Sequence, residues 1–343
     1  MDTRLNALTD WVSQQPEFAG AALTPVAGDA SFRRYFRAQA GNRQAIAMDA
    51  PPGHEDCRPF VAIARHWRAQ GVAVPAILAE DLTQGFLLLE DFGDQLMLSA
   101  LTPDSADALY RQAMDELLVI QQAPDSPDWP LPPYDEALLD REMALFPDWL
   151  IEQQLGLEIS DRERCMLDTS FAFLRESALA QPQVTVHRDY HSRNLLIRPG
   201  ARVPGVIDFQ DAVRGAITYD LVSLLKDCYI AWPEARVSAW VNHYRQLSAA
   251  AGLHHADADT FRQWFELMGM QRHLKAAGIF ARLALRDGKT GYLADVPRTV
   301  HYLVHSSSRL PALRHFHQWL LQTVVPALTA LTSPDPLRAG HGG

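Results

Sequence analysis

The chain has 343 residues, of which 48% are hydrophobic and 21% charged, a balance typical of a folded protein with a substantial apolar core. Its formal net charge is −10 and it contains no block of Lys or Arg, which excludes the basic surface of a nucleic-acid binder. The three cysteines, Cys57, Cys165 and Cys228, are too widely spaced for a zinc site or a disulfide framework. Without a signal-peptide core or a long apolar run, we expect a cytoplasmic protein with no membrane partner, and its size predicts two lobes.

The first lobe is expected to begin with a helix, followed by a meander of three strands. Residues 26–28 lead through a turn into 32–37, and Gly41-Asn42 turns the chain into 45–48. Pro59 then starts a helix, expected to pack on the meander, whose apolar residues recur at helical spacing: Phe60, Ile63, Ala64 and Trp67.

Two further short strands, at 76–79 and 86–89, would complete the small sheet. We place the end of this N-terminal, nucleotide-binding lobe at residue 93. Residues 94–332 show a mostly helical pattern and are expected to form the catalytic and substrate lobe. Residues 333–343 are expected to be a loose tail.

A cluster of polar residues interrupts the helical pattern of the second lobe. A short apolar strand is followed by the triplet His-Arg-Asp, which ends at Asp189, and Asn194 comes five residues later. Two short strands, at 195–197 and 206–207, flank a Pro-Gly turn, and the second of them ends in Asp208. A hairpin therefore brings Asn194 and Asp208 to one end of a small sheet, with Asp189 on the loop beside them.

These three side chains match the needs of phosphoryl transfer from ATP. A carboxylate must orient the attacking hydroxyl group and accept its proton, a task that suits Asp189. Oxygen ligands must hold Mg²⁺ against the phosphates, which suits Asn194 and Asp208 because a hard cation prefers amide and carboxylate oxygens. The sequence thus predicts an ATP- and Mg²⁺-dependent kinase.

The pattern resembles the aminoglycoside phosphotransferase and choline kinase family, whose members are protein-kinase-like enzymes that act on small molecules. Within that family it is similar to the kinases of cell-wall recycling, through segments spread along nearly the whole chain: GDASFRRYFR (28–37), MDAPP (48–52), HRDYHSRN (187–194), IDFQDA (207–212), YDL (219–221), QRHLK (271–275) and RDGK (286–289). The resemblance implies an α+β, protein-kinase-like two-lobed fold with a small antiparallel sheet lobe and a larger, mainly helical lobe. It also implies phosphorylation of the anomeric hydroxyl of N-acetylmuramate and N-acetylglucosamine, to give sugar 1-phosphates.

A lysine that the kinase pattern requires in the first lobe is absent. The lysines of this chain are Lys226, Lys275 and Lys289, all in the second lobe. We expect Arg33 or Arg34 to supply the missing positive charge to the nucleotide. Adjacent residues of a strand point to opposite faces, so at most one of the two is expected to reach it.

Other residues of the site are predicted from their positions in the chain. Residues 90–92 are expected to form the hinge that holds adenine, with Glu90 contributing backbone groups and Phe92 helping to bury the ring. His191 and Arg193 in the catalytic loop, together with Asp211, are expected to face the acceptor, the alternative for each being local stabilisation of the loop.

The residues alone indicate the size of the acceptor molecule but do not identify it. The chain runs from Asp208 into the next apolar helix within about a dozen residues, which leaves no long activation segment for a peptide and favours a small acceptor. The partners are therefore expected to be ATP and a small sugar. The alternatives are a kinase of an aminoglycoside, choline or homoserine, or a nucleotide-binding pseudokinase. Oligomeric state and anomer preference stay open.

Overall fold

The computed structural model describes residues 2–26, 32–198 and 200–332. The chain divides into two compact units, one formed by residues 1–132 and 185–214 and the other by 133–184 and 215–343. The lobe boundary expected after residue 93 falls inside the first unit and stays a prediction. The expected tail at 333–343 lies outside the described residues.

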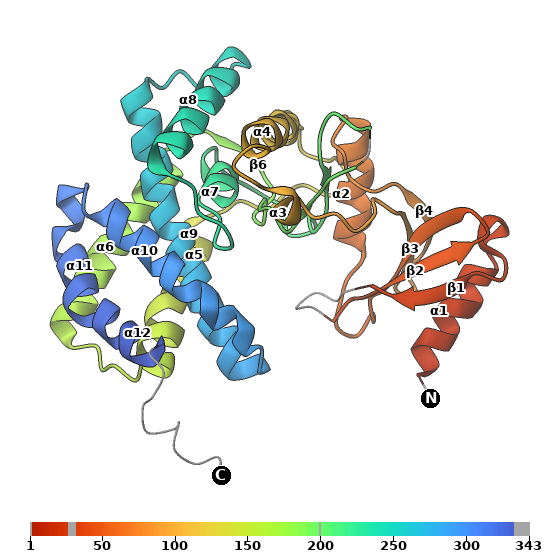
Figure 1. The fold of residues 1–343 in the computed structure, drawn as a ribbon, viewed down its shortest axis with the longest axis horizontal. Coiled ribbons are helices and arrows are strands. Elements are labelled where there is room, and N and C mark those ends of the chain that lie inside the picture. Colours follow the sequence, from red (N-terminus) through yellow and green to blue (C-terminus); the bar gives the residue numbers. More distant parts are fainter. Residues whose placement is uncertain (1, 27–31, 199, 333–343) are drawn as a thin grey trace, which may run out of the picture. The chain divides into compact units, whose positions relative to one another are not determined.

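The first unit contains a five-stranded antiparallel sheet with the strand order β1-β2-β3-β5-β4 (Figure 1). Its strands are β1 (Ala22–Pro25), β2 (Arg34–Ala40), β3 (Arg43–Asp49), β4 (Ile77–Asp81) and β5 (Phe86–Glu90). The turn expected at Gly41-Asn42 joins β2 to β3, and Gly41 adopts a φ of 59°, which glycine accepts without strain. The first strand lies earlier than the predicted 26–28, of which residues 27 and 28 are outside the described part.

Helix α1 (Thr3–Ser13) contributes buried apolar residues to the core on which the meander packs. Asp2 caps the helix by accepting a hydrogen bond from the backbone N–H of Leu5 at 3.0 Å. The buried face of α1 then packs with apolar residues of the sheet and the short η1 (Pro16–Phe18) in one cluster: Leu8, Trp11, Val12, Phe18, Phe36, Ala38, Ala45, Ala47, Phe86 and Leu88. The sheet, whose strand β2 begins at Arg34 directly after Arg33, is therefore braced by the start of the chain.

Helix α2 (Arg58–Ala69) follows the predicted helical spacing, since Phe60, Ile63, Ala64 and Trp67 are all buried. Its packing on the meander stays a prediction, and its aromatic rings contact a later part of the chain. The ring of Phe60 lies 4.7 Å from that of Phe209, and the ring of Trp67 lies 6.1 Å from that of His187. Helix α2 therefore packs against the segments next to Asp189 and Asp208.

The first unit also contains helices α3 (Met97–Ala100) and α4 (Ala106–Gln122) and the short strands β7 (Leu195–Leu196) and β8 (Gly205–Val206). Strands β6 (Gln183–Val186) and β9 (Val213–Ala216) pair with each other, and the boundary between the units passes through both. These strands confirm the predicted break in the helical pattern between residues 184 and 208.

The second unit is helical and surrounds the 30-residue helix α9 (Ala258–Asp287), which contacts α5, α6, α7, α8 and α10 (Figure 1). A Cβ at Gly278 of α9 would lie 2.3 Å from the backbone of Leu145, so this glycine permits close packing against α5. The remaining elements are α5 (Glu136–Leu145), η2 (Phe146–Gln154), α6 (Asp161–Leu179), α7 (Tyr219–Leu225), α8 (Glu234–Ala250), η3 (Thr290–Asp295), α10 (Val296–Ser307), η4 (Pro311–Leu313), α11 (Arg314–Trp319), η5 (Leu320–Val324) and α12 (Val325–Thr332).

The antiparallel sheet and the helical second unit confirm the predicted α+β class. Across the described residues, every helix is too short or too polar to cross a bilayer.

Candidate active site

The predicted hairpin places Asn194 beside Asp208. Strands β7 and β8 pair antiparallel, with Leu195 opposite Val206, and the backbone N–H of Ile207 donates to the carbonyl of Asn194 at 3.1 Å. The Nδ2 atom of Asn194 lies 3.5 Å from Oδ2 of Asp208. The same Nδ2 donates to the backbone carbonyl of Asp189 at 3.0 Å, so one amide links the three predicted residues.

Two residues next to the predicted site adopt backbone conformations that residues other than glycine rarely adopt. Arg188 has a φ of 78° and Asp208 a φ of 65°, both in the left-handed region. Such strained residues persist where the surrounding structure fixes them, and they are concentrated at functional sites. The strain turns the backbone immediately next to Asp189 and at Asp208 itself.

The buried side chain of His187 stabilises the loop that carries Asp189. Its side chain is fully buried, its Nε2 lies 2.9 Å from the carbonyl oxygen of Ile207, and its Nδ1 accepts from the backbone N–H of Asp189 at 3.2 Å. Burial lowers the pKa of His187 to about 4, so the ring is neutral and carries its proton on Nε2. The neutral imidazole thereby orients the backbone of Asp189.

Arg33 approaches the predicted metal ligand. One of its guanidinium nitrogens lies 3.8 Å from Oδ1 of Asp208, and its Nε lies 3.4 Å from Oε2 of Glu55. Glu55 also accepts from the backbone N–H of Phe32 at 3.3 Å. Gln210 donates to the same oxygen, Oδ1 of Asp208, at 2.8 Å and so helps to fix the carboxylate. A cation is thus positioned beside the carboxylate that would hold Mg²⁺.

Arg34 points elsewhere, as expected for its neighbouring position. Its Nε donates to Oδ2 of Asp49 at 3.0 Å, and it also pairs with Asp2. Asp49 is fully buried and accepts a second guanidinium from Arg4 at 2.9 Å. The guanidinium of Arg34 therefore belongs to an ion-pair network that links the start of the chain to β2 and β3. Its predicted contact with nucleotide has no support in this arrangement.

The predicted hinge residues make contacts within the first unit. Oε2 of Glu90 accepts from the backbone N–H of Ala76 at 3.1 Å and from Arg68 at 3.0 Å. Phe92 is 7% exposed, and a Cβ at Gly205 would lie 2.3 Å from its ring, so the ring packs directly on β8. The structure gives both side chains a bracing role, and their contact with adenine stays a prediction.

The three residues expected to face the acceptor lie on the catalytic loop or next to it. His191 is partly buried, and its backbone N–H donates to the carbonyl of Asp189 at 3.0 Å. Arg193 and Asp211 are exposed, and the carbonyl of Asp211 accepts from Arg188 at 3.3 Å. Their contact with an acceptor stays a prediction.

Two residues of this site were not identified from the sequence. Glu55 lies in the loop between β3 and α2. In the sequence, the only indication of its role was its acidic side chain shortly before that helix. Gln210 lies between Asp208 and Asp211, and its Nε2 is within 2.8 Å of the first and 3.4 Å of the second. Neither contact could be recognised without the three-dimensional structure.

Comparisons with known proteins identify the family of this chain. The model of the phosphotransferase enzyme family matches residues 22–258. A protein of Pseudomonas putida named N-acetylmuramate/N-acetylglucosamine kinase is 47% identical, over 91% of this chain and 94% of its own length. A protein of Pseudomonas aeruginosa with the same name is also 47% identical, over 89% of each chain.

A solved structure of similar fold is Plasmodium vivax ethanolamine kinase, with a TM-score of 0.64, 10% identity, and coverage of 91% of this chain and 89% of that one. This likeness shows the fold and confirms the predicted protein-kinase-like architecture. Because the family model covers well over half of the sequence, the chain belongs to the phosphotransferase enzyme family.

Proposed function

We propose that this enzyme transfers the terminal phosphoryl group of ATP to the anomeric hydroxyl of N-acetylmuramate and N-acetylglucosamine. The observation that carries the proposal is the amide of Asn194, which lies 3.5 Å from Asp208 and 3.0 Å from the carbonyl of Asp189. The acceptor is supported by two relatives named N-acetylmuramate/N-acetylglucosamine kinase, which are 47% identical along nearly the whole chain.

In this proposal the carboxylate of Asp189 orients the acceptor hydroxyl and takes its proton. Asp208 and Asn194 offer hard oxygen donors, a set that fits Mg²⁺ when phosphate oxygens and water complete the coordination. Bound Mg²⁺ would neutralise charge on the ATP phosphates. Gln210 keeps the Asp208 carboxylate oriented through its 2.8 Å hydrogen bond.

Arg33 and Glu55 would replace the lysine and glutamate pair of other kinases. The guanidinium of Arg33 lies within 3.4 Å of Glu55 and 3.8 Å of Asp208, so it is held where phosphate oxygens next to the metal would lie. Its side chain is only 9% exposed, which strengthens its electrostatic interaction. Glu55 would fix the direction of the guanidinium and not contact the phosphates itself.

The Arg33 assignment predicts a specific kinetic change. Arg33→Gln removes one charge-assisted contact and should lower kcat/KM for ATP by about 10- to 100-fold, with Arg33→Lys partly restoring it. Glu55→Gln should also lower kcat/KM for ATP, by a smaller factor. Steady-state kinetics at varied ATP measures this. The matched control is Arg43→Gln, because Arg43 is an exposed arginine of β3 that pairs with Glu17. An unchanged kcat/KM for ATP in Arg33→Gln would leave Arg33 with a structural role only.

The acceptor is tested by a coupled assay of ADP release with four compounds: N-acetylmuramate, N-acetylglucosamine, choline and an aminoglycoside. We expect release with the two amino sugars and only background release with the other two. Release with choline or the aminoglycoside alone would replace the proposed acceptor, and no acceptor-dependent release would favour a nucleotide-binding protein without turnover.

A further inference from the structure

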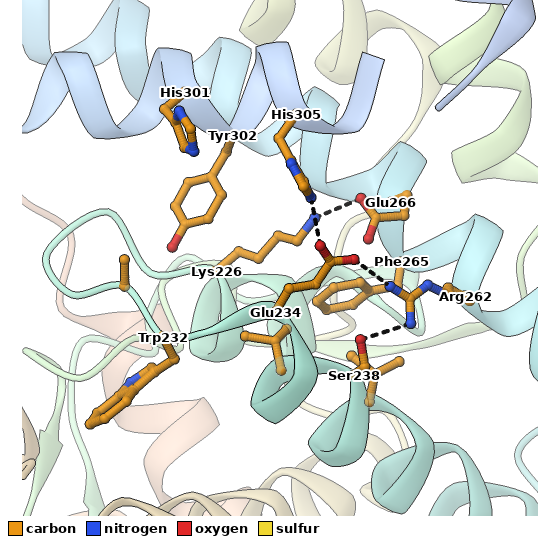
Figure 2. Close-up of a pocket in the computed structure, with 13 residues that line it drawn as sticks. Lys226, Trp232, Glu234, Ser238, Arg262, Phe265, Glu266, His301, Tyr302 and His305 are labelled. Carbon is orange, nitrogen blue, oxygen red and sulfur yellow. Dashed lines mark hydrogen bonds and ion pairs between the residues drawn. The ribbon is translucent and has the colours of Figure 1, made fainter. Parts of the chain in front are cut away.

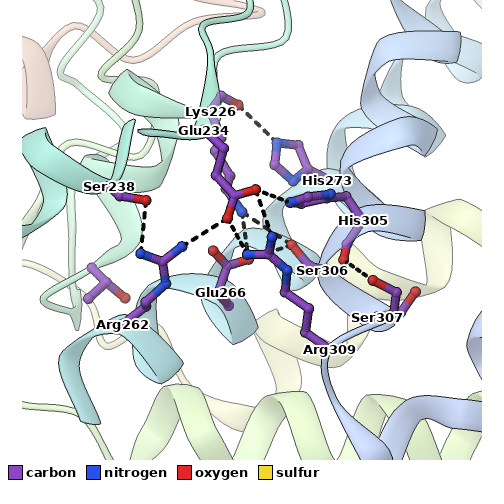
Figure 3. Close-up of polar contacts among 12 residues, drawn as sticks. Lys226, Glu234, Ser238, Arg262, Glu266, His273, His305, Ser306, Ser307 and Arg309 are labelled. Carbon is purple, nitrogen blue, oxygen red and sulfur yellow. Dashed lines mark hydrogen bonds and ion pairs between the residues drawn. The ribbon is translucent and has the colours of Figure 1, made fainter. Parts of the chain in front are cut away.

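The second unit contains a pocket of about 180 Å³, lined by residues of α8, α9, α10 and the segment that follows α7 (Figure 2). Lys226 of the lining lies 2.6 Å from Glu266. Arg262 lies 3.1 Å from Glu234, so each of these cations has a carboxylate partner in the same lining (Figure 3). The pairs neutralise one another, and their role is to join the helices of the second unit.

Asp208, in the first unit, instead accepts a hydrogen bond from a neutral side chain, the amide of Gln210. The residue between them anchors the backbone. Phe209 is fully buried, its ring lies 4.7 Å from that of Phe60, and its carbonyl accepts from the backbone N–H of Ala212 at 3.1 Å. A fixed turn of the chain therefore presents the amide of Gln210 to the carboxylate of Asp208.

The NH₂ group of Gln210 faces two carboxylates. Its Nε2 lies 2.8 Å from Oδ1 of Asp208 and 3.4 Å from Oδ2 of Asp211. Carboxylate oxygens only accept hydrogen bonds, so the amide can satisfy both of them only through its two N–H groups. Its oxygen, Oε1, is buried and has no hydrogen-bond partner among the described residues. The two carboxylates therefore set the orientation of the amide.

The two oxygens of the Asp208 carboxylate have different surroundings. Oδ1 accepts from Gln210 and lies 3.8 Å from a guanidinium nitrogen of Arg33. Oδ2 lies 3.5 Å from Nδ2 of Asn194, the second predicted metal ligand. A divalent cation that bound Oδ1 would have to displace an N–H donor and approach a guanidinium that repels it. Oδ2 is therefore the oxygen through which Asp208 would bind a cation.

The number of oxygens that a carboxylate offers affects which cation it prefers. Mg²⁺ is small and requires a nearly octahedral arrangement of ligands, most of which are water and phosphate oxygens. Ca²⁺ is larger, accepts more oxygens in a flexible arrangement, and often takes both oxygens of one carboxylate. A carboxylate with one of its oxygens held by an amide therefore suits Mg²⁺ better than Ca²⁺.

We propose that Gln210 is a positioning residue that limits Asp208 to one metal-binding oxygen and so makes the site selective for Mg²⁺ over Ca²⁺. This inference rests on the proposed function, because it takes Asp208 as a ligand of the cation that accompanies the nucleotide. It adds a determinant of cation choice that lies outside the ligands themselves.

The test is the ratio of two dissociation constants, the Kd for Ca²⁺ divided by the Kd for Mg²⁺. Mn²⁺ bound to the full chain with ADP is followed by electron paramagnetic resonance, and each of the two cations is titrated in to displace it. Gln210→Met keeps the length of the side chain but removes its N–H donors, so Ca²⁺ gains access to Oδ1. We expect the ratio to fall by about 3- to 10-fold, the effect of one neutral hydrogen bond.

A second variant and a matched control complete the experiment. Gln210→Ala, measured independently, should lower the ratio in the same direction, and thermal melts report whether each variant folds. Gln84→Met is the control, because Nε2 of Gln84 donates to Oδ2 of Asp81 at the same distance of 2.8 Å, on the exposed turn between β4 and β5. The control should keep the ratio of the unchanged chain.

The outcomes separate this inference from the proposed function. An unchanged ratio in the folded Gln210 variants overturns the inference, as does an equal weakening of both cations, which would show only a structural role. The titration contains no acceptor, so its result does not depend on which sugar is phosphorylated. Failure of the unchanged chain to bind Mn²⁺ with ADP would overturn the metal site itself, whereas a lowered ratio without sugar-dependent ADP release would overturn only the proposed acceptor.

Discussion

Asp189→Asn is expected to lower kcat by about 10²- to 10⁴-fold, the range for removing a general base, while the fold and nucleotide binding persist. The substitution keeps the shape of the side chain but removes its ability to accept the acceptor's proton. The backbone contacts of the residue, with Nδ1 of His187 at 3.2 Å and with Asn194 at 3.0 Å, do not involve the carboxylate and should survive.

The measurement is acceptor-dependent ADP release, accompanied by ADP titration and a thermal melt. Asp104→Asn is the matched control, because Asp104 is an exposed aspartate of the same unit and should leave kcat unchanged. If Asp189→Asn retained turnover within a few-fold of the unchanged chain, another group would have to take the proton.

Glu142→Ala is expected to lower the free energy of unfolding by about 3–5 kcal/mol, because it leaves a buried charge unpaired. Oε1 of Glu142 lies 3.1 Å from Nζ of Lys275, and its other oxygen accepts from the hydroxyl of Tyr134. Lys275 also donates to the hydroxyl of Tyr219 at 3.0 Å, and Gln271 donates to that of Tyr134 at 3.2 Å. Burial raises the pKa of Tyr134 well above its usual value, so its hydroxyl stays a donor to Glu142.

Urea unfolding followed by circular dichroism measures this change. Glu136→Ala on the same helix is the control, since Glu136 is exposed and its pair with Arg175 should contribute at most about 1 kcal/mol. The double variant Glu142→Leu with Lys275→Met removes both charges and should lose less stability than Glu142→Ala. A loss below about 1 kcal/mol for Glu142→Ala would contradict a buried, coupled network.

The hairpin and its three polar residues could be predicted because local signals agree. A Pro-Gly turn between two short apolar segments fixes which ends meet, and so places Asn194 beside Asp208. The buried face of α2 was equally predictable from the spacing of Phe60 and Trp67. The residues that this face packs against could not be predicted, because Phe209 and His187 come from a part of the chain far away in sequence.

The choice between Arg33 and Arg34 also lay beyond the sequence. Alternation assigned the two arginines to opposite faces, but only the structure shows Glu55 and Asp208 on one side and Asp49 on the other. The segment 271–275 is a similar case. Charged and polar residues on a helix are usually solvated, yet Gln271 and Lys275 are buried because Tyr134 and Glu142 bring partners from far away in sequence.

The position of the transferred phosphate tests the central claim most directly. Phosphorus NMR of the product made from N-acetylmuramate and ATP should show one phosphomonoester signal coupled to the anomeric proton, in equal amount to the ADP formed. A phosphate on any other hydroxyl, or ADP formed without a phosphorylated sugar, would contradict anomeric phosphoryl transfer by Asp189, Asn194 and Asp208.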